Sequence, residues 1–195
     1  MCKCIPKSDI PAILPDIRTA IEYAEDDAVE LSPEEGMVIS AFELPKGIQP
    51  LFQLFVECLM HGNSSARTNA ARGMNDLLKF TSSKSLKPFI TLLAGPLIRV
   101  VGDRWPIEVK YAILECFEPL LKKLPIFIKP FIPQLQRTFV KALSEPTSPQ
   151  YRRLGVERIR QLIPLQPRLD QLASEFTSGL KQVAINAQNV EQGGS

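Results

Sequence analysis

The sequence predicts an all-α protein in which short helix pairs stack side by side. The chain has 195 residues, 45% hydrophobic and 23% charged, which is the composition of a folded globular domain. Three observations point to this fold. Similar segments recur about every 40 residues, apolar residues between them follow helical spacing, and short polar stretches separate the predicted helices.

The recurrence is clearest in two segments that begin with the same four residues. KPFITLLAGPLIRVVGD, from Lys87, aligns with KPFIPQLQRTFVKALSE, from Lys129, at an offset of 42 residues. Related segments from Gln49 and Gln171 align with these at offsets of 38 and 37 residues. A helix pair every ~40 residues is the period of HEAT and armadillo arrays. Because one pair cannot bury its apolar stripe alone, we expect a HEAT-like α-solenoid of about three helix pairs plus terminal helices.

The first 47 residues do not show the repeat. Apolar residues at helical spacing predict one amphipathic helix from Ile10 to Leu31. Ser32 to Gly47 reads as a connector, because prolines and glycines interrupt it. A connector of this length is unusual in a compact array and indicates a function or an insertion. Residues 1–47 are therefore predicted to be an N-terminal helix with an acidic connector.

The repeat region is predicted to cover residues 48–183. It comprises helix pairs at 48–80, 87–122 and 129–163, and a half repeat at 168–183, followed by a flexible tail at 184–195. The second helix of the middle pair has a continuous apolar stripe made of Val109, Ala112, Ile113, Cys116, Phe117, Leu120 and Leu121. The turns HGNSS, GDRWP and SEPTSP carry residues that turn the chain and cap the next helix.

Two prolines fall inside the predicted helices of the middle pair. Pro96 lies in the first helix of the middle pair, where a missing N–H predicts a kink. Pro119 is expected to bend or shorten the second helix of that pair. The helix at 168–183 has no following partner, so we expect the chain to be a fragment or a truncated product of a longer array.

Charge is distributed unevenly along the chain. The net charge is only +2, yet Thr19 to Pro45 contains eight acidic residues and no basic one. The remainder, from Lys46 to Ser195, carries a net charge of +9. One interpretation is a solvated acidic face; the other is a basic surface for an acidic partner such as RNA or an acidic protein domain.

The composition argues against catalysis, metal binding and cofactor chemistry. His61 is the only histidine, so a histidine metal site or a Ser-His or Cys-His nucleophile would have to use it. Cys2 and Cys4 form C-x-C without the second cysteine pair of a zinc site, and Cys58 and Cys116 fall in apolar helical patterns. No catalytic residue, metal site, cofactor or small-molecule substrate is expected. The sequence also shows neither a signal peptide nor a membrane span, which favours a cytoplasmic protein.

Several motifs resemble one family. GPLIRVVGDRW (Gly95 to Trp105), KPFIPQLQRTFVKAL (Lys129 to Leu143) and FELPKG (Phe42 to Gly47) are similar to the very large HEAT-repeat translational activator of the general control pathway, in its C-terminal HEAT segment. The similarity extends from about Phe42 to Leu180. It implies a protein-binding scaffold that helps to sense stalled ribosomes and to activate the kinase of initiation factor 2 alpha. The implied partner is the RWD domain of that kinase, with ribosome contact expected only within a larger chain.

Candidate partner-binding residues lie in the segment most similar to the family. Arg99 and Arg104 are predicted at a helix end and in the following turn, where a guanidinium can pair bidentately with a carboxylate. Trp105 is the only tryptophan, and it either forms part of this interface or fills the joint between repeats.

The same turns also predict a structural ladder. HEAT turns commonly carry an Asp followed six or seven positions later by a basic residue. Asp103 and Lys110 fit this template, and Arg67 and Arg152 hold the corresponding places in the neighbouring pairs. We assign these four residues to the ladder rather than to partner binding.

Two alternatives to a translational scaffold remain open on sequence grounds. One is a generic HEAT-repeat interaction module outside translation, which the composition allows but the GPLIR-x2-GDR motif disfavours. The other is a HEAT-like nucleic-acid-binding enzyme that would use Asp103, Arg104 and Trp105. Such an enzyme needs an aromatic-lined pocket and a strongly basic groove, which one tryptophan and a net charge of +2 disfavour.

Overall fold

A computed structural model describes residues 9–102, 104–165, 173–174, 177–181 and 184–185. The chain divides into two compact units, Met1–Phe127 and Ile128–Ser195. Helices dominate both units, and the strands of the described residues form one two-stranded sheet. The predicted all-α, HEAT-like fold class is confirmed, whereas the boundaries assigned to the domains and tail stay predictions.

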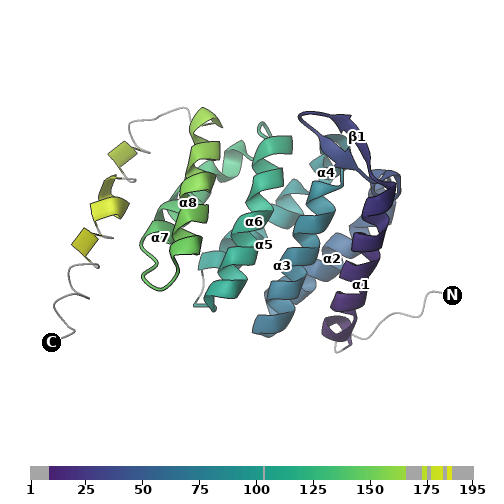
Figure 1. Ribbon diagram of the computed structural model, residues 1–195, viewed down its shortest axis with the longest axis horizontal. Helices are drawn as coiled ribbons and strands as arrows, with labels where there is room; N and C mark the ends of the chain where they lie inside the picture. The colour runs from purple at the N-terminus through teal and green to yellow at the C-terminus, as the bar shows by residue number, and fades with distance from the viewer. Residues whose placement is uncertain (1–8, 103, 166–172, 175–176, 182–183, 186–195) are drawn as a thin grey trace. The chain divides into compact units, whose positions relative to one another are not determined.

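The first unit stacks helices in two layers (Figure 1). Helix α3 (Ser64–Lys79) lies between α1 (Ile10–Ala24) and α6 (Ile107–Lys123) in one layer, and α2 (Pro45–His61) packs against α5 (Ile90–Gly102) in the other. The pairs α2–α3 and α5–α6 also pack internally. Fully buried side chains fill the space between the helices, among them Phe52, Phe55, Leu59, Met74, Leu77, Leu93, Ile113 and Phe117.

The predicted helix from Ile10 to Leu31 is wrong beyond Ala24, where α1 ends. Three acidic residues follow in the short 3-10 helix η1 (Glu25–Asp27), and negative charge is unfavourable at a helix C-terminus. The chain then forms the strands β1 (Val29–Ser32) and β2 (Gly36–Val38), so the predicted connector begins with a β-hairpin. Gly36 has a φ of +72°, a conformation that glycine adopts without strain.

The rest of the predicted connector is also structured. The 3-10 helix η2 (Ser40–Glu43) follows the hairpin, and α2 begins at Pro45, where the fixed φ of proline suits the first helical turn. Val38, Ile39 and Phe42 are buried. The backbone N–H of Ile39 donates to the carbonyl of Phe80 at 2.9 Å, which fixes the end of the hairpin to the end of α3.

Neither internal proline ends its helix. Pro96 lies within α5 and Pro119 within α6, which continues to Lys123. The predicted shortening of the second helix at Pro119 is therefore wrong, and the bends predicted at the two prolines stay predictions. Pro119 is buried in the apolar face of α6, so the packing of its ring contributes to holding the helix together.

Polar residues cap the helices after two of the three predicted turns, whereas α6 begins after Pro106 without a side-chain cap. The Asn63 side chain caps α3 by accepting the backbone N–H of Ala66 at 2.9 Å. A short helical segment, α4 (Ser83–Leu86) followed by η3 (Lys87–Phe89), leads into α5. In η3 the ring of Phe89 packs against that of Phe52 with 5.3 Å between the ring centroids.

The second unit contains one described helix pair. After η4 (Lys129–Phe131), α7 (Ile132–Leu143) packs against α8 (Pro149–Leu162), and η5 (Ile163–Leu165) follows. Ser148 caps α8 by accepting the backbone N–H of Tyr151 at 3.2 Å. Most of the predicted half repeat at 168–183 and of the tail lies outside the described residues.

One described stretch, Ser83–Gly102, has the length and mean hydropathy (1.3) that a membrane-crossing helix would need. It is divided among α4, η3 and α5, and α5 packs against both α2 and α6. Core helices of globular proteins meet the same length and hydropathy criterion, and α5 is packed as a core helix.

Candidate protein-binding site at the inter-helix turns

Basic residues occupy the fourth position of three successive second helices: Arg67 in α3, Lys110 in α6 and Arg152 in α8. The Arg67 guanidinium donates to the carbonyls of Leu59 and, at 2.8 Å, Met60. Because the last carbonyls of a helix lack partners within it, this buried arginine completes the C-terminal end of α2.

Arg152 makes similar contacts in the second unit. Its Nη1 donates to the carbonyl of Glu145 at 2.7 Å and to that of Pro146 at 3.2 Å, just beyond the end of α7. Lys110 is half-buried, and Asp103 lies outside the described residues. The ladder assigned to these four positions therefore stays a prediction, although Arg67 holds carbonyls at the end of the helix before it and Arg152 holds carbonyls just beyond such an end.

Trp105 lies in the turn between α5 and α6 and connects it to the preceding pair. The Arg67 guanidinium is 4.0 Å from the centroid of the indole ring, a cation–π contact. Trp105 is half-buried, so it combines a packing contact between repeats with exposed aromatic surface. This geometry is compatible with both roles considered for Trp105, and its role in partner binding stays a prediction.

Arg99 and Arg104 present positive charge beside this tryptophan. Arg99 lies in the last turn of α5, Arg104 precedes Trp105, and both arginines are exposed. A basic group in the last turn of a helix also interacts favourably with the helix dipole. The end of α5 and the turn after it thus carry two guanidinium groups and a half-exposed indole, the side chains most frequent in protein-interface hot spots. Their role as a binding site is a prediction that rests on this placement.

A polar cluster at the opposite end of α3 escaped the sequence analysis. The Nζ of Lys123, at the end of α6, donates to the carbonyls of Leu78, Lys79 and Thr81 at 3.2, 2.6 and 2.8 Å. These carbonyls end α3, so a lysine of one pair caps a helix of the preceding pair. A lysine in the last turn of a helix usually indicates only a solvated charge, so no specific signal in the sequence predicts this contact.

Two carboxylates, Glu35 in the turn of the hairpin and Glu43 at the end of η2, complete the cluster at the start of α4. The backbone N–H of Ser83 donates to Glu35 at 2.8 Å, and that of Ser82 donates to Glu43 at 2.8 Å. The hydroxyls of both serines donate to the same carboxylates. The hairpin is therefore fastened to the segment between α3 and α5 by charge-assisted hydrogen bonds.

Lys123 provides a pH-dependent contribution to stability. Burial lowers its pKa to about 8, with Glu35 and Glu43 opposing the shift. A lysine with a lowered pKa releases its proton on folding, so its contribution to the free energy of unfolding rises as pH increases between about 8 and the ordinary value of 10.5. We expect urea unfolding to show the wild type gaining up to about 1 kcal/mol over Lys123→Met between pH 7 and pH 9, since partial exposure screens the effect.

Subtracting the free energy of unfolding of Lys123→Met from that of the wild type isolates the contribution of Lys123, because tyrosines and cysteines that titrate in the same pH range are present in both proteins. Lys129→Met, at an exposed position that does not contribute to the lowered pKa of Lys123, is the matched control and should give a difference that is constant with pH. The free energy of unfolding of the wild type minus that of Lys123→Met should rise with pH. A difference that stays constant or falls as pH rises would contradict the assigned direction of the pKa shift.

Other reactive side chains form no site within the described ranges. No group of three His, Cys, Asp or Glu residues that could hold a metal ion occurs among them. His61 is exposed at the end of α2, and Cys58 and Cys116 are buried free thiols. Burial raises the pKa of the Cys116 thiol, which keeps it protonated and inert near neutral pH.

Comparison with curated proteins finds relatives of a single kind. The chain is 41% identical over 155 residues, 80% of its length, to the eIF-2-alpha kinase activator GCN1 of Saccharomyces cerevisiae. It is 34% identical over 190 residues, 94% of its length, to the protein ILITYHIA of Arabidopsis thaliana, and 34% identical over 148 residues, 75% of its length, to the stalled ribosome sensor GCN1 of Homo sapiens. The chain spans only 6–7% of the length of these relatives. No family model and no solved structure matches.

Proposed function

The chain belongs to the GCN1 family, and from that premise we propose that it is a non-enzymatic, protein-binding segment of a translational regulator. The relatives are named as a kinase activator and as stalled ribosome sensors, which places their role in the control of translation. The described residues supply surfaces for proteins rather than a catalytic centre. Such a segment would act in the cytoplasm, where translation takes place.

The proposed partner is the RWD domain of the kinase that phosphorylates initiation factor 2 alpha. The observation that carries this proposal is the end of α5 and the turn after it, where Arg99 and Arg104 are exposed and Trp105 is half-buried. Arginine and tryptophan make the largest contributions in protein interfaces, and carboxylates of a partner can pair with both guanidinium groups. Arg67 holds the indole ring from behind and so positions it before a partner arrives.

The mechanism would be tethering. A segment that binds the regulatory domain of a kinase raises the effective concentration of that kinase near the signal recognised elsewhere in the larger protein. Contact with the ribosome would then involve parts of the larger protein, since this chain spans only a few per cent of it. An interaction module outside translation is disfavoured, because every relative found carries a GCN1-type name or is its plant homologue.

Calorimetric titration of the chain with the RWD domain tests this proposal. We expect measurable binding by the wild type and at least about tenfold weaker binding by the Arg99→Ala/Arg104→Ala double variant, because two interface arginines are lost. Arg72→Ala/Arg153→Ala is the matched control, since it removes the same charge from two exposed positions outside this turn. Failure of the folded wild type to bind, or equal loss in both double variants, would refute kinase docking at this turn.

A further inference from the structure

The β-hairpin presents a strand with an open edge. Among the described residues, β1 pairs antiparallel with β2 alone, in a two-stranded sheet. β2 packs against α3 on its other side, whereas β1 is exposed along its length. An exposed edge strand offers unpaired backbone N–H and C=O groups to another extended chain.

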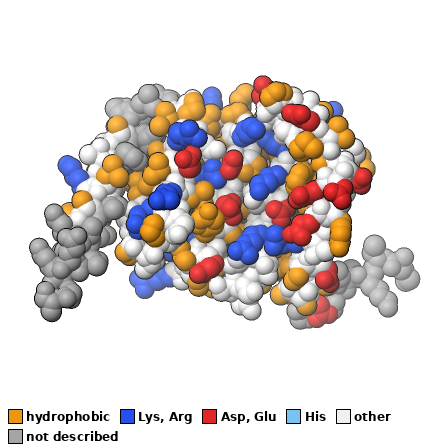
Figure 2. Space-filling model, viewed as in Figure 1, with side chains coloured by type: hydrophobic (Ala, Val, Ile, Leu, Met, Phe, Trp, Pro, Cys, Tyr) orange, Lys and Arg blue, Asp and Glu red, His pale blue; other side chains and the backbone are white. Residues whose placement is uncertain are grey.

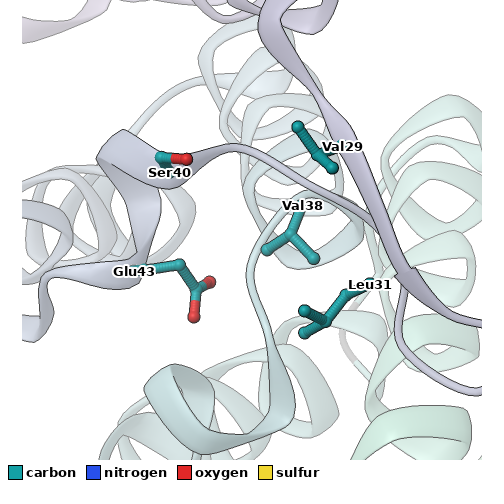
Figure 3. A pocket seen from close by; sticks show the side chains of 5 residues that line it. All are labelled: Val29, Leu31, Val38, Ser40 and Glu43. Carbon is teal, nitrogen blue, oxygen red and sulfur yellow. The ribbon is translucent and has the colours of Figure 1, made fainter.

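An apolar cavity lies beside this open strand. It has a volume of about 250 Å³ and is lined by Val29, Leu31, Val38, Ser40 and Glu43. Val29 and Leu31 both line this cavity from β1, where the pairing with β2 shifts register between Glu30 and Ser32 and leaves Leu31 at a bulge. Figure 3 shows the two side chains on either side of Val38. They are 63% and 61% exposed, which is unusual for large apolar side chains on an ordered strand.

The hairpin is held in place before any partner binds. Glu35 in its turn and Glu43 in the η2 segment that follows it accept hydrogen bonds at the start of α4, and Ile39, directly after β2, donates to the end of α3. A strand that is already positioned loses little conformational freedom when a second chain pairs with it. The open edge and the cavity therefore form a preorganised surface rather than a loose loop.

The charge around the hairpin indicates the chemistry of its occupant. No Lys or Arg occurs between Arg18 and Lys46. The acidic side chains near the strand are exposed, and they are Glu25, Asp26, Asp27, Glu30 and Glu34. Figure 2 shows acidic and apolar side chains together over the end of the first unit that carries α1 and β1. Charge complementarity favours a basic chain with apolar residues that fit the cavity.

We propose that β1 binds an extended segment of a partner protein that alternates apolar and basic residues and adds to the hairpin as a third strand. The apolar side chains of this segment enter the cavity between Val29 and Leu31, and its Lys and Arg residues face the exposed acidic side chains near the strand. Backbone pairing provides affinity, and the cavity and the acidic side chains provide specificity.

This surface is separate from the turn assigned to the kinase domain. Arg67, which contacts Trp105, lies in the first turn of α3, whereas the hairpin is fastened to the end of α3. Helix α3 has 16 residues and is therefore about 24 Å long. The two surfaces can be tested independently, and failure of one leaves the other standing.

Fluorescence anisotropy with a labelled peptide tests the proposal. The probe is Lys-Val-Arg-Val-Lys-Val-Arg-Val, and the comparison peptides are its Glu-for-Lys/Arg counterpart and a version with every backbone amide N-methylated. We expect the basic peptide to bind, the acidic peptide not to bind, and the N-methylated peptide to bind at least about tenfold more weakly, because neither of its edges retains backbone N–H donors. Raising the salt concentration from about 50 to about 300 mM should weaken binding severalfold.

A variant pair locates the site. Val29→Ser/Leu31→Ser should weaken binding of the basic peptide by about tenfold, because both apolar contacts are lost, while its circular dichroism remains that of the wild type. Ile126→Ser is the matched control, since Ile126 is 68% exposed and lies away from the hairpin in sequence. Hydrogen exchange should slow at residues 29–32 when the peptide is added.

Four outcomes would overturn the proposal. They are absence of binding by the folded wild type, equal binding of the acidic peptide, unchanged affinity in Val29→Ser/Leu31→Ser, and slowed exchange elsewhere than β1. Light scattering provides a further check: a stable dimer lost in that double variant would assign the surface to a second copy of this chain. None of these results bears on binding of the RWD domain by Arg99 and Arg104.

Discussion

Replacing Phe55 with alanine is expected to lower the free energy of unfolding by about 3 to 5 kcal/mol. The Phe55 ring is fully buried in α2, where it packs against α3. A Cβ added at Gly73 of α3 would lie 2.6 Å from two carbon atoms of this ring, so the ring occupies the space that the glycine leaves. Alanine at position 55 would leave a cavity between the two helices, which the surrounding structure fills only in part.

A double-mutant cycle with Gly73→Ala tests whether the Phe55 ring occupies the space beside Gly73. Alone, Gly73→Ala should destabilise by about 1 to 3 kcal/mol, because its methyl group would overlap the ring. Combined with Phe55→Ala, the methyl group would enter vacated space. The loss of free energy of unfolding in the double variant should therefore be smaller, by about 1 kcal/mol or more, than the sum of the losses in the two single variants.

Urea unfolding followed by circular dichroism measures each variant of this cycle. Gln53→Ala, at an exposed position of the same helix, is the control and should change stability by less than about 0.5 kcal/mol. Strict additivity of the two substitutions would show that Phe55 and Gly73 do not share this space.

Arg67→Met is expected to destabilise the chain by about 2 to 4 kcal/mol. The methionine would keep apolar volume but remove the donors to the carbonyls of Leu59 and Met60, leaving buried acceptors without these partners. It would also remove the cation from the face of Trp105. Arg67→Lys keeps the charge but not the planar fork, so it should lie between wild type and methionine.

Tryptophan fluorescence gives this prediction a second readout. Trp105 is the only tryptophan, so its emission reports the contact directly. We expect the emission of folded Arg67→Met to differ from that of the wild type, whereas Arg152→Met should leave it unchanged. Arg152 is the matched control because it contacts carbonyls in the second unit and has no cation–π contact among the residues that the structure describes. Wild-type stability and emission in Arg67→Met would rule out a structural role for the arginine.

The helical repeats could be predicted from sequence because their signal is local. An apolar stripe such as that of α6 requires only a helix and a neighbour, and the polar turns supply caps such as Asn63. The hairpin could not be predicted in this way. Its strands have four and three residues, and Glu35 and Glu43 hold it through partners 48 and 39 residues away. The alternation of apolar and charged residues at Val29, Glu30 and Leu31 is nonetheless typical of a strand, although these residues also fit the end of the helix predicted from Ile10 to Leu31.

The candidate site shows the same division. Sequence position singled out Arg67, Arg104 and Trp105, because each lies in or beside a turn that recurs with the repeat. The contact between Arg67 and Trp105 was not predicted, since it joins side chains 38 residues apart whose approach depends on how two pairs stack. The three carbonyl contacts of Lys123 escaped prediction for the same reason.

Helices α3 and α6 are joined by polar contacts near both of their ends. Arg67 meets Trp105 near the start of α3, and Lys123 binds the carbonyls at its finish. An apolar interface alone would permit one helix to slide along the other at little cost, whereas directional contacts at two separated points resist sliding. Under mechanical load this part of the chain should therefore behave as a stiff element, so that a pull on one helix is transmitted to the next rather than absorbed between them.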